Sequence, residues 1–356
     1  MTREYIKDNI ESLPEFDNHF SVSFLNDKEN GLKGFIAIHR KNPNFPSFGA
    51  TRLWYYNSET EALQDAMRLS KMMSYKSALA GLVAGGAKGV IILPQDKKID
   101  RKKLLQSYAK QVDLLKGSFI TGTDVGLDQP DLLVLKKVTP YIVGFNGYTT
   151  ELTSKGIFYA IEVALAEVFG SGKIEGRTFA IQGVGKVGES LLSLLHEKAK
   201  KIFIADIDKK TLKKVAKKYP KAVIKNPEEI HKQDIDVFCP CALSGAITSK
   251  NISDLKCKII SGGANNQLED ENVGVLLHRL KILYCPDYIV NAGGLIAVVN
   301  EYENPYFDYG SVSKKVLGIK KRLAGIFKTS KKENKPTNLV ANELAIRIFD
   351  NYHKLK

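Results

Sequence analysis

The sequence has few cysteines, one tryptophan and no long apolar run. Its 356 residues include four cysteines, Cys239, Cys241, Cys257 and Cys285, all within apolar, strand-like stretches. A small secreted chain held by disulfides would place cysteines in loops, so we expect reduced, buried thiols. No stretch approaches the roughly 18 to 20 consecutive apolar residues that a membrane helix requires. The segment MTREYIKDNIESLPEF is charged and lacks the apolar core of a signal peptide, so we expect a cytoplasmic location and no membrane partner.

Metal-binding and nucleic-acid-binding patterns are weak as well. Cys239 and Cys241 form a Cys-x-Cys pair, but no second cysteine or histidine cluster stands at ligand spacing, so we expect no metal site. The formal net charge is +14, yet only nine of the 53 basic residues are arginines. Because phosphate recognition favours the planar arginine fork, a solvated, lysine-rich surface explains the charge better than a nucleic-acid site.

The chain is long enough for two domains and has the composition of a folded protein, with 44% hydrophobic and 26% charged residues. The first 150 residues mix strand patterns such as FIAIHR and GVIILP with helical patterns such as DRKKLLQSYAKQVDLL. From about 155 to 310, short apolar strands alternate regularly with helices. This alternation favours an α/β fold with a parallel, doubly wound sheet. The expected strands of that sheet are TFAIQG, KIFIAD, AVIK, DVFCP, KIISGG and ILYCPD.

The end of the chain carries one more predicted helix. KTSKKENKPTN, residues 328–338, is typical of a polar break. LVANELAIRIFDNYHKL after it has the spacing of one amphipathic helix.

A glycine pattern follows the first strand of the alternating region. Gly183, Gly185 and Gly188 stand in G-x-G-x-x-G order between a β-branched strand and an apolar-periodic helix. The first glycine allows the tight turn, the second lets the backbone approach a pyrophosphate, and the third lets helix and strand pack closely. The pyrophosphate would lie on the amides at the helix start. The sequence therefore predicts a dinucleotide-binding loop.

Asp206 ends the next strand, 23 residues after Gly183. A carboxylate there can accept hydrogen bonds from both ribose hydroxyls and would repel a 2′-phosphate, and Asp208 adds to that repulsion. The predicted cofactor is NAD rather than NADP.

Two lysines lie in an apolar, glycine-broken stretch, SYKSALAGLVAGGAKGV. Lys76 is expected to end a helix, and Lys88 to lie in GGAKG just before the strand VIIL. An unpaired buried ammonium costs several kcal/mol, and the usual escape is a lowered pKa or an anionic partner. An anionic substrate and a proton transfer would offset that cost, whereas a surface loop would explain either lysine alone.

Six motifs in order resemble the amino-acid dehydrogenases of the glutamate, leucine, phenylalanine and valine group. They are MSYKSALAGLVAGGAKGV, TGTDVG, QGVGKVG, PCAL, GGANNQL and CPDYIVNAGG. The resemblance covers roughly residues 30 to 310, and the chain length is most similar to that of the leucine dehydrogenases. It implies a substrate-binding and oligomerisation domain over residues 1–148, an NAD-binding Rossmann domain over 149–330, and a C-terminal helix, 331–356, that packs back on the first domain. It also implies a homo-oligomer.

The same resemblance implies roles for single residues. Lys76 would hold the substrate α-carboxylate. Lys88 would be a low-pKa lysine that polarises the carbonyl or activates the water, and Asp124 in TDVG would be its proton shuttle. Asn291 in NAGG would contact the substrate amino group, and Thr153 the nicotinamide amide. The implied cofactor-binding set is Gly183, Val184, Gly185, Lys186, Val187, Gly188, Asp206, Ile207, Thr153, Cys241, Ala242 and Asn265.

The residues at the side-chain end of the implied substrate site are apolar. Phe48, followed by Gly49 in FGATR, and Val298 stand where glutamate-specific relatives have a lysine and a serine. A substrate carboxylate would lose its partners there, which excludes glutamate and implies an apolar amino acid. Phe48 would either shrink the pocket towards branched aliphatic substrates or stack on an aromatic one.

Other interpretations stay open at this point. The family's GNPSP-x-T segment stands here as GYTTELT, residues 147–153, without either proline, so altered domain closure or altered specificity is expected. A non-catalytic nucleotide-binding regulator would keep GVGKVG yet tolerate loss of the lysines or the aspartate, and all three are present. Oligomer size and physiological direction do not follow from the sequence.

Overall fold

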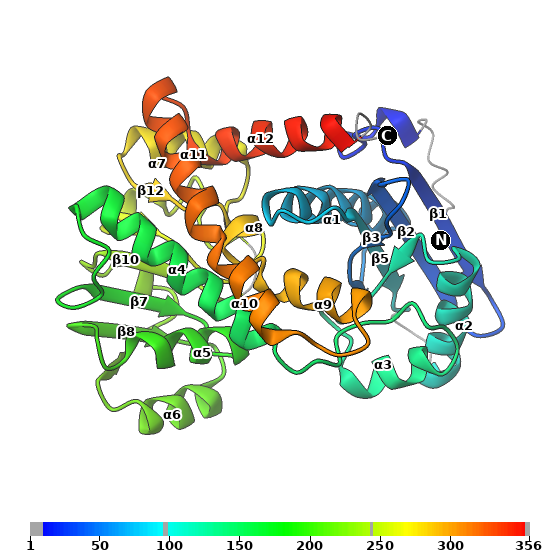
Figure 1. Ribbon diagram of the computed structural model, residues 1–356. Coiled ribbons are helices and arrows are strands. Elements are labelled where there is room, and N and C mark those ends of the chain that lie inside the picture. Colours follow the sequence, from blue (N-terminus) through cyan, green and yellow to red (C-terminus); the bar gives the residue numbers. More distant parts are fainter. Residues whose placement is uncertain (1–9, 95–98, 243–244, 353–356) are drawn as a thin grey trace. The chain divides into compact units, whose positions relative to one another are not determined.

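The computed structural model describes residues 10–94, 99–242 and 245–352 (Figure 1). The start of the predicted N-terminal segment, Leu243 of the PCAL motif and the last residues of the predicted terminal helix lie outside the described residues. The chain forms two compact units. Unit 1 consists of Met1–Asn146, Glu301–Phe307 and Ala345–Lys356. Unit 2 consists of Gly147–Asn300 and Asp308–Leu344.

Unit 1 is built on a mixed six-stranded sheet with the order β1-β2-β5-β3-β6, in which β4 also pairs with β5. β1 and β2 run antiparallel and β2 is antiparallel to β5, whereas β3 and β4 are parallel to β5. The strands are β1 (Ser21–Asp27), β2 (Leu32–Arg40), β3 (Ser47–Phe48), β4 (Thr51–Trp54), β5 (Gly85–Ile92) and β6 (Phe119–Ile120).

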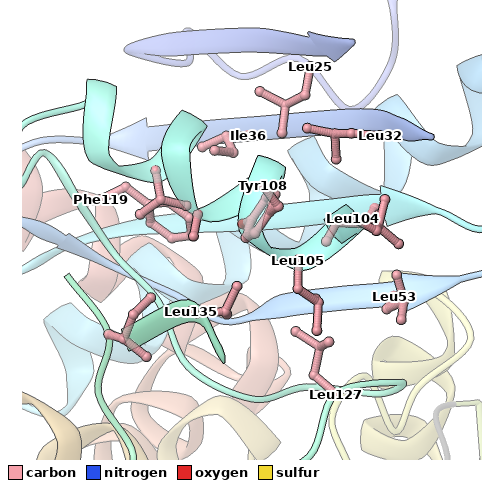
Figure 2. Packing of buried hydrophobic residues seen from close by; sticks show 14 of the residues in the cluster. Leu25, Leu32, Ile36, Leu53, Leu104, Leu105, Tyr108, Phe119, Leu127 and Leu135 are labelled. Atoms are coloured by element: carbon pink, nitrogen blue, oxygen red, sulfur yellow. The ribbon is translucent and has the colours of Figure 1, made fainter. Parts of the chain in front are cut away.

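Helices cover both faces of this sheet. They are α1 (Glu59–Leu79), α2 (Arg101–Leu114) and α3 (Gln129–Lys136). Aspartate and serine side chains cap their N-termini, and Asp128 and Asp131 form a full capping box at α3. α1 packs on the face that carries Val90, while Leu104, Leu105 and Tyr108 of α2 fill the core on the other face (Figure 2). β5 is therefore buried between two helical layers.

Unit 2 contains a parallel six-stranded sheet with the order β12-β11-β10-β7-β8-β9. Counted from β7 as the first strand, this is the order 3-2-1-4-5-6 of doubly wound dinucleotide-binding domains. All six strands predicted from the alternation are present, so the predicted fold class is confirmed. Their bounds are β7 (Thr178–Gln182), β8 (Lys201–Ala205), β9 (Ala222–Ile224), β10 (Val237–Pro240), β11 (Ile259–Ile260) and β12 (Leu283–Tyr284).

Helices alternate with these strands and follow them. Strand β10 is buried at every position, as expected for a parallel strand covered on both faces. The helices are α4 (Thr149–Phe169), α5 (Lys186–Leu195), α6 (Lys209–Lys218), α7 (Glu271–Arg279), α8 (Asp287–Val290), α9 (Gly293–Glu303), α10 (Tyr309–Leu317), α11 (Ile319–Glu333) and α12 (Thr337–Tyr352). Three short 3-10 helices complete the described part, at Ile10–Ser12, Ile230–Lys232 and Ile252–Asp254.

Two boundaries differ from the sequence-based prediction. The polar stretch 328–338 is mostly not a break, because α11 continues to Glu333; its buried side chains Ile326, Phe327 and Ser330 anchor a helix whose exposed face carries the lysines. Residues 301–307, placed in the second predicted domain, belong to unit 1. The Glu301 carboxylate accepts the backbone N–H groups of Gly144 and Phe145 at 3.0 and 2.9 Å, which holds this segment there.

Helices in the part of the chain that the structure describes are too short or too polar to span a membrane.

Candidate active site

The glycines of GGAKG let two helices close on strand β5. A Cβ atom added at Gly86 would lie 2.0 Å from the backbone nitrogen of Ser74 in α1, and one at Gly89 would lie 2.0 Å from the hydroxyl oxygen of Tyr108 in α2. The structure thus corrects one expectation, because Lys88 lies inside a strand and not in a loop before one. Pairing of this segment with β2 and β3, made possible by the glycines, extends the strand to Gly85.

Lys88 is a buried cation with one anionic partner. The residue is 5% exposed, and its Nζ donates to Oδ2 of Asp124. Burial lowers the pKa of Lys88 below its ordinary value, and the attraction of Asp124 offsets part of that change. The site therefore holds an amine that can lose its proton more readily than a lysine in water.

Asp124 reaches Lys88 from the loop after β6. This loop is tied to β4, since Leu53 donates its backbone N–H to Val125 at 2.9 Å. Gly126 has a φ of +85°, and a Cβ atom there would lie 1.9 Å from the carbonyl oxygen of Leu53. Burial raises the pKa of Asp124, but the charges of Lys88 and Arg52 outweigh it and hold that pKa well below its usual range.

Two further residues, Arg52 and Asp65, belong to this charge cluster and were not predicted from the sequence. Arg52 of β4 donates from Nε to Oδ2 of Asp124 at 3.2 Å and from Nη1 to Oδ2 of Asp65 in α1 at 2.9 Å. The only sequence signal for Arg52 was its place at the end of FGATR. Neither partner of Arg52 is close to it in sequence, which is why the pattern did not reveal the cluster.

Lys76 is half-buried in the last turn of α1. Ser74 of α1 packs on Gly86 of β5. Lys76 lies two residues after Ser74, and Lys88 lies two residues after Gly86. The two lysines predicted to act together thus flank one contact between α1 and β5. The hydroxyl of Ser77 donates to the carbonyl oxygen of Ala84 at 2.6 Å and fixes the turn between these elements.

Phe48 pairs with Gly86 across β3 and β5, so its side chain is on the same face of the sheet as that of Lys88. The ring is fully buried. It is stacked on Phe45 with ring centroids 6.0 Å apart, and Tyr302 meets it edge-on at 5.4 Å. Gly49 follows, where a Cβ atom would lie 1.9 Å from the carbonyl oxygen of Ala87.

The three glycines of the predicted fingerprint have three different surroundings in unit 2. Gly183 has a φ of +92°, which forms the turn. A Cβ atom at Gly188 would lie 1.9 Å from the carbonyl oxygen of Gly183, whereas one at Gly185 would have no atom of the described residues within 4 Å. The cradle at Gly185, at the start of α5, is open to a ligand, as a pyrophosphate site requires.

Residues on both sides of this turn complete the loop. Val184 is buried, Lys186 is exposed and Val187 is half-buried. Asp206 accepts the backbone N–H of Val184 at 2.8 Å, which places its carboxylate beside the turn. Ile207 after it is 84% exposed, as a residue at an open edge would be.

The PCA segment runs along the other side of the turn. Cys241 donates its N–H to Gln182 at 2.7 Å, and its Sγ accepts the N–H of Gly263 at 3.4 Å. A Cβ atom added at Gly183 would lie 2.7 Å from the backbone nitrogen of Ala242. All four cysteines are free thiols, and burial raises the pKa of Cys241 to about 12. Cys241 therefore lies beside the glycine turn as an uncharged thiol.

Asn291 is a buried amide with an acceptor to spare. It is 5% exposed, and its Nδ2 donates to Oδ1 of Asn265 at 2.9 Å. Its own Oδ1 is buried and has no hydrogen-bond partner among the residues that the structure describes. Buried polar atoms are rarely left unpaired, so this oxygen fits a ligand that donates an N–H group.

Thr153 is held close to the same segment. Its Oγ1 donates to the carbonyl oxygen of Thr149 within α4 at 2.7 Å. A Cβ atom at Gly294 would lie 3.0 Å from this Oγ1, so the NAGG glycines allow α9 to meet the first turns of α4. Val298 is half-buried, one turn further along α9.

The predicted site residues thus form two groups, one in each unit. Unit 1 contains the charged pair and the aromatic cluster. Unit 2 contains the open glycine cradle and the buried amide. A parallel sheet of this order with a glycine turn after its first strand is typical of dinucleotide-binding domains, such as those of dehydrogenases.

Comparison with known proteins gives the family. The family model described as Glutamate/Leucine/Phenylalanine/Valine dehydrogenase matches residues 144–212 and 201–348. The model of the Glu/Leu/Phe/Val dehydrogenase dimerisation domain matches residues 16–141. The chain therefore belongs to the glutamate, leucine, phenylalanine and valine dehydrogenase family, and it is an amino-acid dehydrogenase.

Individual relatives match almost end to end. Leucine dehydrogenase of Geobacillus stearothermophilus is 36% identical over 341 residues, 94% of this chain and 92% of the relative. L-tryptophan dehydrogenase of Nostoc punctiforme is 39% identical over 342 residues, 95% of each chain. The crystal structure of L-tryptophan dehydrogenase from Nostoc punctiforme aligns with a TM-score of 0.81 at 38% identity, covering 94% of this chain and 97% of that one.

Proposed function

We propose that the protein catalyses the reversible, NAD-dependent oxidative deamination of an apolar L-amino acid of the leucine or valine type to its 2-oxo acid and ammonia. The observation that carries this proposal is the buried ion pair of Lys88 with Asp124. Oxidation leaves an imine, and the water that attacks it must lose a proton. A lysine whose pKa burial has lowered can accept that proton, and the adjacent carboxylate can pass it on.

The ends of the substrate have matching partners in this proposal. Lys76 binds the α-carboxylate as a half-buried cation at the end of α1. Asn291 accepts the amino group at its unpartnered Oδ1. Each of these contacts would restrain one end of the substrate and so lower the entropic cost of the encounter.

The residues of unit 2 fit NAD. The cradle at Gly185 has room for a pyrophosphate, and the N-terminal amides of α5 can donate to it. Asp206 would accept hydrogen bonds from the ribose hydroxyls and repel a 2′-phosphate, and Thr153 would contact the carboxamide. When bound, NAD would supply the acceptor for the hydride of the substrate α-carbon.

The apolar residues Phe48 and Val298 exclude a side-chain carboxylate and so argue against glutamate. Phe48 is bulkier than Val298 and leaves less room for the side chain of the substrate, which favours a branched aliphatic amino acid. An aromatic substrate is the second candidate. The stacked cluster of Phe48, Phe45 and Tyr302 supports it, because another ring can join such a cluster. The similarity to a tryptophan dehydrogenase points the same way.

The two units divide the work in this proposal. Unit 1 binds substrate and forms the homo-oligomer, in line with the dimerisation-domain match, and unit 2 binds NAD. The return of the terminal helix to the first domain fits the placement of residues 345–352 in unit 1. The free thiols support the cytoplasmic location, which stays a prediction.

A substrate panel tests the function. Purified protein is mixed with NAD and single L-amino acids, and the absorbance of the reduced cofactor is followed. We expect turnover with branched aliphatic or aromatic substrates, none with glutamate, and loss of roughly 10²-fold or more in Lys88→Ala. Activity on glutamate alone, or normal turnover in the variant, rejects the proposal.

A further inference from the structure

We propose that Arg52 is a positioning residue for proton transfer, which keeps Asp124 ionised and oriented whenever Lys88 is neutral. This inference rests on the proposed roles of Lys88 and Asp124. It assigns a function to an arginine that touches neither the substrate nor the cofactor in that proposal.

The position of Arg52 follows from the sheet. Arg52 of β4 pairs with Val90 of β5, so its side chain is on the same face as those of Val90 and Lys88. From there it reaches Oδ2 of Asp124, the same oxygen that Lys88 contacts. The side chains of Arg52 and Asp124 are 21% and 17% exposed. Two cations from adjacent strands thus hold one half-buried carboxylate oxygen.

The two cations differ in what happens to them during the reaction. Lys88 must lose its proton to act as a base, and at that moment Asp124 loses its ammonium partner. A carboxylate left in a half-buried place beside a neutral amine would tend to take up a proton. The guanidinium of Arg52 stays charged at every working pH, so it keeps Asp124 oriented and favours its return to the ionised form after each proton that Asp124 passes on.

Arg52 acts on Lys88 as well. Its positive charge adds to burial in lowering the pKa of Lys88, while Asp124 and Asp65 oppose the change. The charged groups that act on the amine therefore come from β4, from the loop after β6 and from α1. Removing the guanidinium should raise the pKa values of both Lys88 and Asp124.

Asp65 fixes Arg52 in turn. Its Oδ2 accepts from Nη1 of Arg52 at 2.9 Å and from the Tyr56 hydroxyl at 2.7 Å. Its Oδ1 accepts from Nη2 of Arg68 at 2.6 Å. With one end of the guanidinium held by Asp65, the Nε–H group points at Asp124 without the freedom that a long side chain usually keeps.

A purely structural ion pair between β4 and α1 would have the same contacts, so the test needs a readout that stability does not move. The variants are Arg52→Gln, Arg52→Lys and, as a matched control, Arg40→Gln. Arg40 ends β2 of the same sheet and pairs with Asp17, not with Asp124. For each we would measure kcat/KM for oxidative deamination against pH, KM for the amino acid, and the thermal unfolding midpoint.

For Arg52→Gln we expect kcat at neutral pH to fall on the order of 10²-fold and KM to change little. The acidic limb of the profile, on which activity rises as Lys88 loses its proton, should be displaced to higher pH. Arg52→Lys should restore much of the profile because it keeps the charge. Arg40→Gln should keep the wild-type dependence of kcat/KM on pH, even if its thermal unfolding midpoint is lower than that of the wild type. A wild-type profile in Arg52→Gln, with Lys88→Ala inactive, would overturn this inference alone. Full activity in Lys88→Ala would instead contradict the proposed function on which this inference rests.

Discussion

The ammonium of Lys88 and the carboxylate of Asp124, 36 residues apart in the chain, form an ion pair inside unit 1. One comes from a strand enclosed by two helices, and the other from a loop that a left-handed glycine turns towards it. A buried pair of this kind contributes little net stability, because desolvation consumes most of the attraction. Its chemistry is the better explanation, since burial and a specific charge partner are how proteins prepare a base.

The first prediction concerns the choice of substrate and uses Phe48→Leu. If Phe48 narrows the site for a branched aliphatic substrate, the smaller side chain should raise kcat/KM for phenylalanine relative to leucine about 10-fold, within the 1 to 3 kcal/mol that pocket shape commands. The ratio of the two kcat/KM values measures this. A fall in that ratio would mean that Phe48 stacks on an aromatic substrate instead.

The second prediction compares Gly86, which lies against backbone of α1, with Gly185, which has open space around it among the described residues. Gly86→Ala should lower the free energy of unfolding by about 3 kcal/mol or more, because the new methyl group meets backbone that cannot move aside. Gly185→Ala should leave stability within about 0.5 kcal/mol yet raise KM for NAD, since its methyl group would occupy the cradle. Denaturant unfolding and cofactor titration separate the two. Equal stability losses would contradict the assignment of the open cradle.

The third prediction concerns the cofactor. In Asp206→Ser the negative charge beside Val184 is gone, so repulsion of a 2′-phosphate disappears. The ratio of kcat/KM with NAD to that with NADP should fall on the order of 10²-fold, more than 2 kcal/mol at 1.36 kcal/mol for each factor of ten. Wild-type protein that already prefers NADP would refute the role given to Asp206.

The fourth prediction concerns acid stability. His39 is fully buried beside Asp17, and burial lowers its pKa from 6.5 to about 4. The unfolded chain therefore takes up a proton there first, and stability that is full above pH 6.5 is lost as the pH falls towards 4. At about 1.4 kcal/mol for each pH unit, the loss is about 3 kcal/mol.

Denaturant unfolding at pH 7 and pH 5 checks this prediction. His39→Gln should flatten the dependence relative to the wild type. His278→Gln, which changes a histidine in unit 2, should leave it in place. The same slope in wild type and His39→Gln would assign the acid loss to other groups.

Much of unit 2 could be predicted because its signals are local. Each parallel strand is a short apolar run, and the turn around Gly183, Gly185 and Gly188 is specified by three residues within six positions. The pattern DRKKLLQSYAKQVDLL also gave α2 to within one residue at each end. The last turns of α11 were predicted as a polar break, because their exposed face is rich in lysine. The buried residues of the same turns are too few to show as a helical pattern in the sequence.

The charge cluster of unit 1 could be predicted only in part. Lys88 and Asp124 stand in motifs, so a resemblance finds them. Arg52 and Asp65 meet them through sheet pairing and the packing of α1, which no window of sequence contains. The unpartnered Oδ1 of Asn291 is a property of burial and hydrogen bonding and has no sequence signal.

The titration of Lys88 itself tests the central claim most directly. Lysine labelled with carbon-13 at Cε would be incorporated into the protein, and the resonance of Lys88 would be assigned by its loss in Lys88→Arg and followed against pH. We predict a midpoint clearly below the ordinary lysine value of 10.5. A midpoint at or above 10.5 would show an amine that stays protonated at working pH, and would contradict its role as the base.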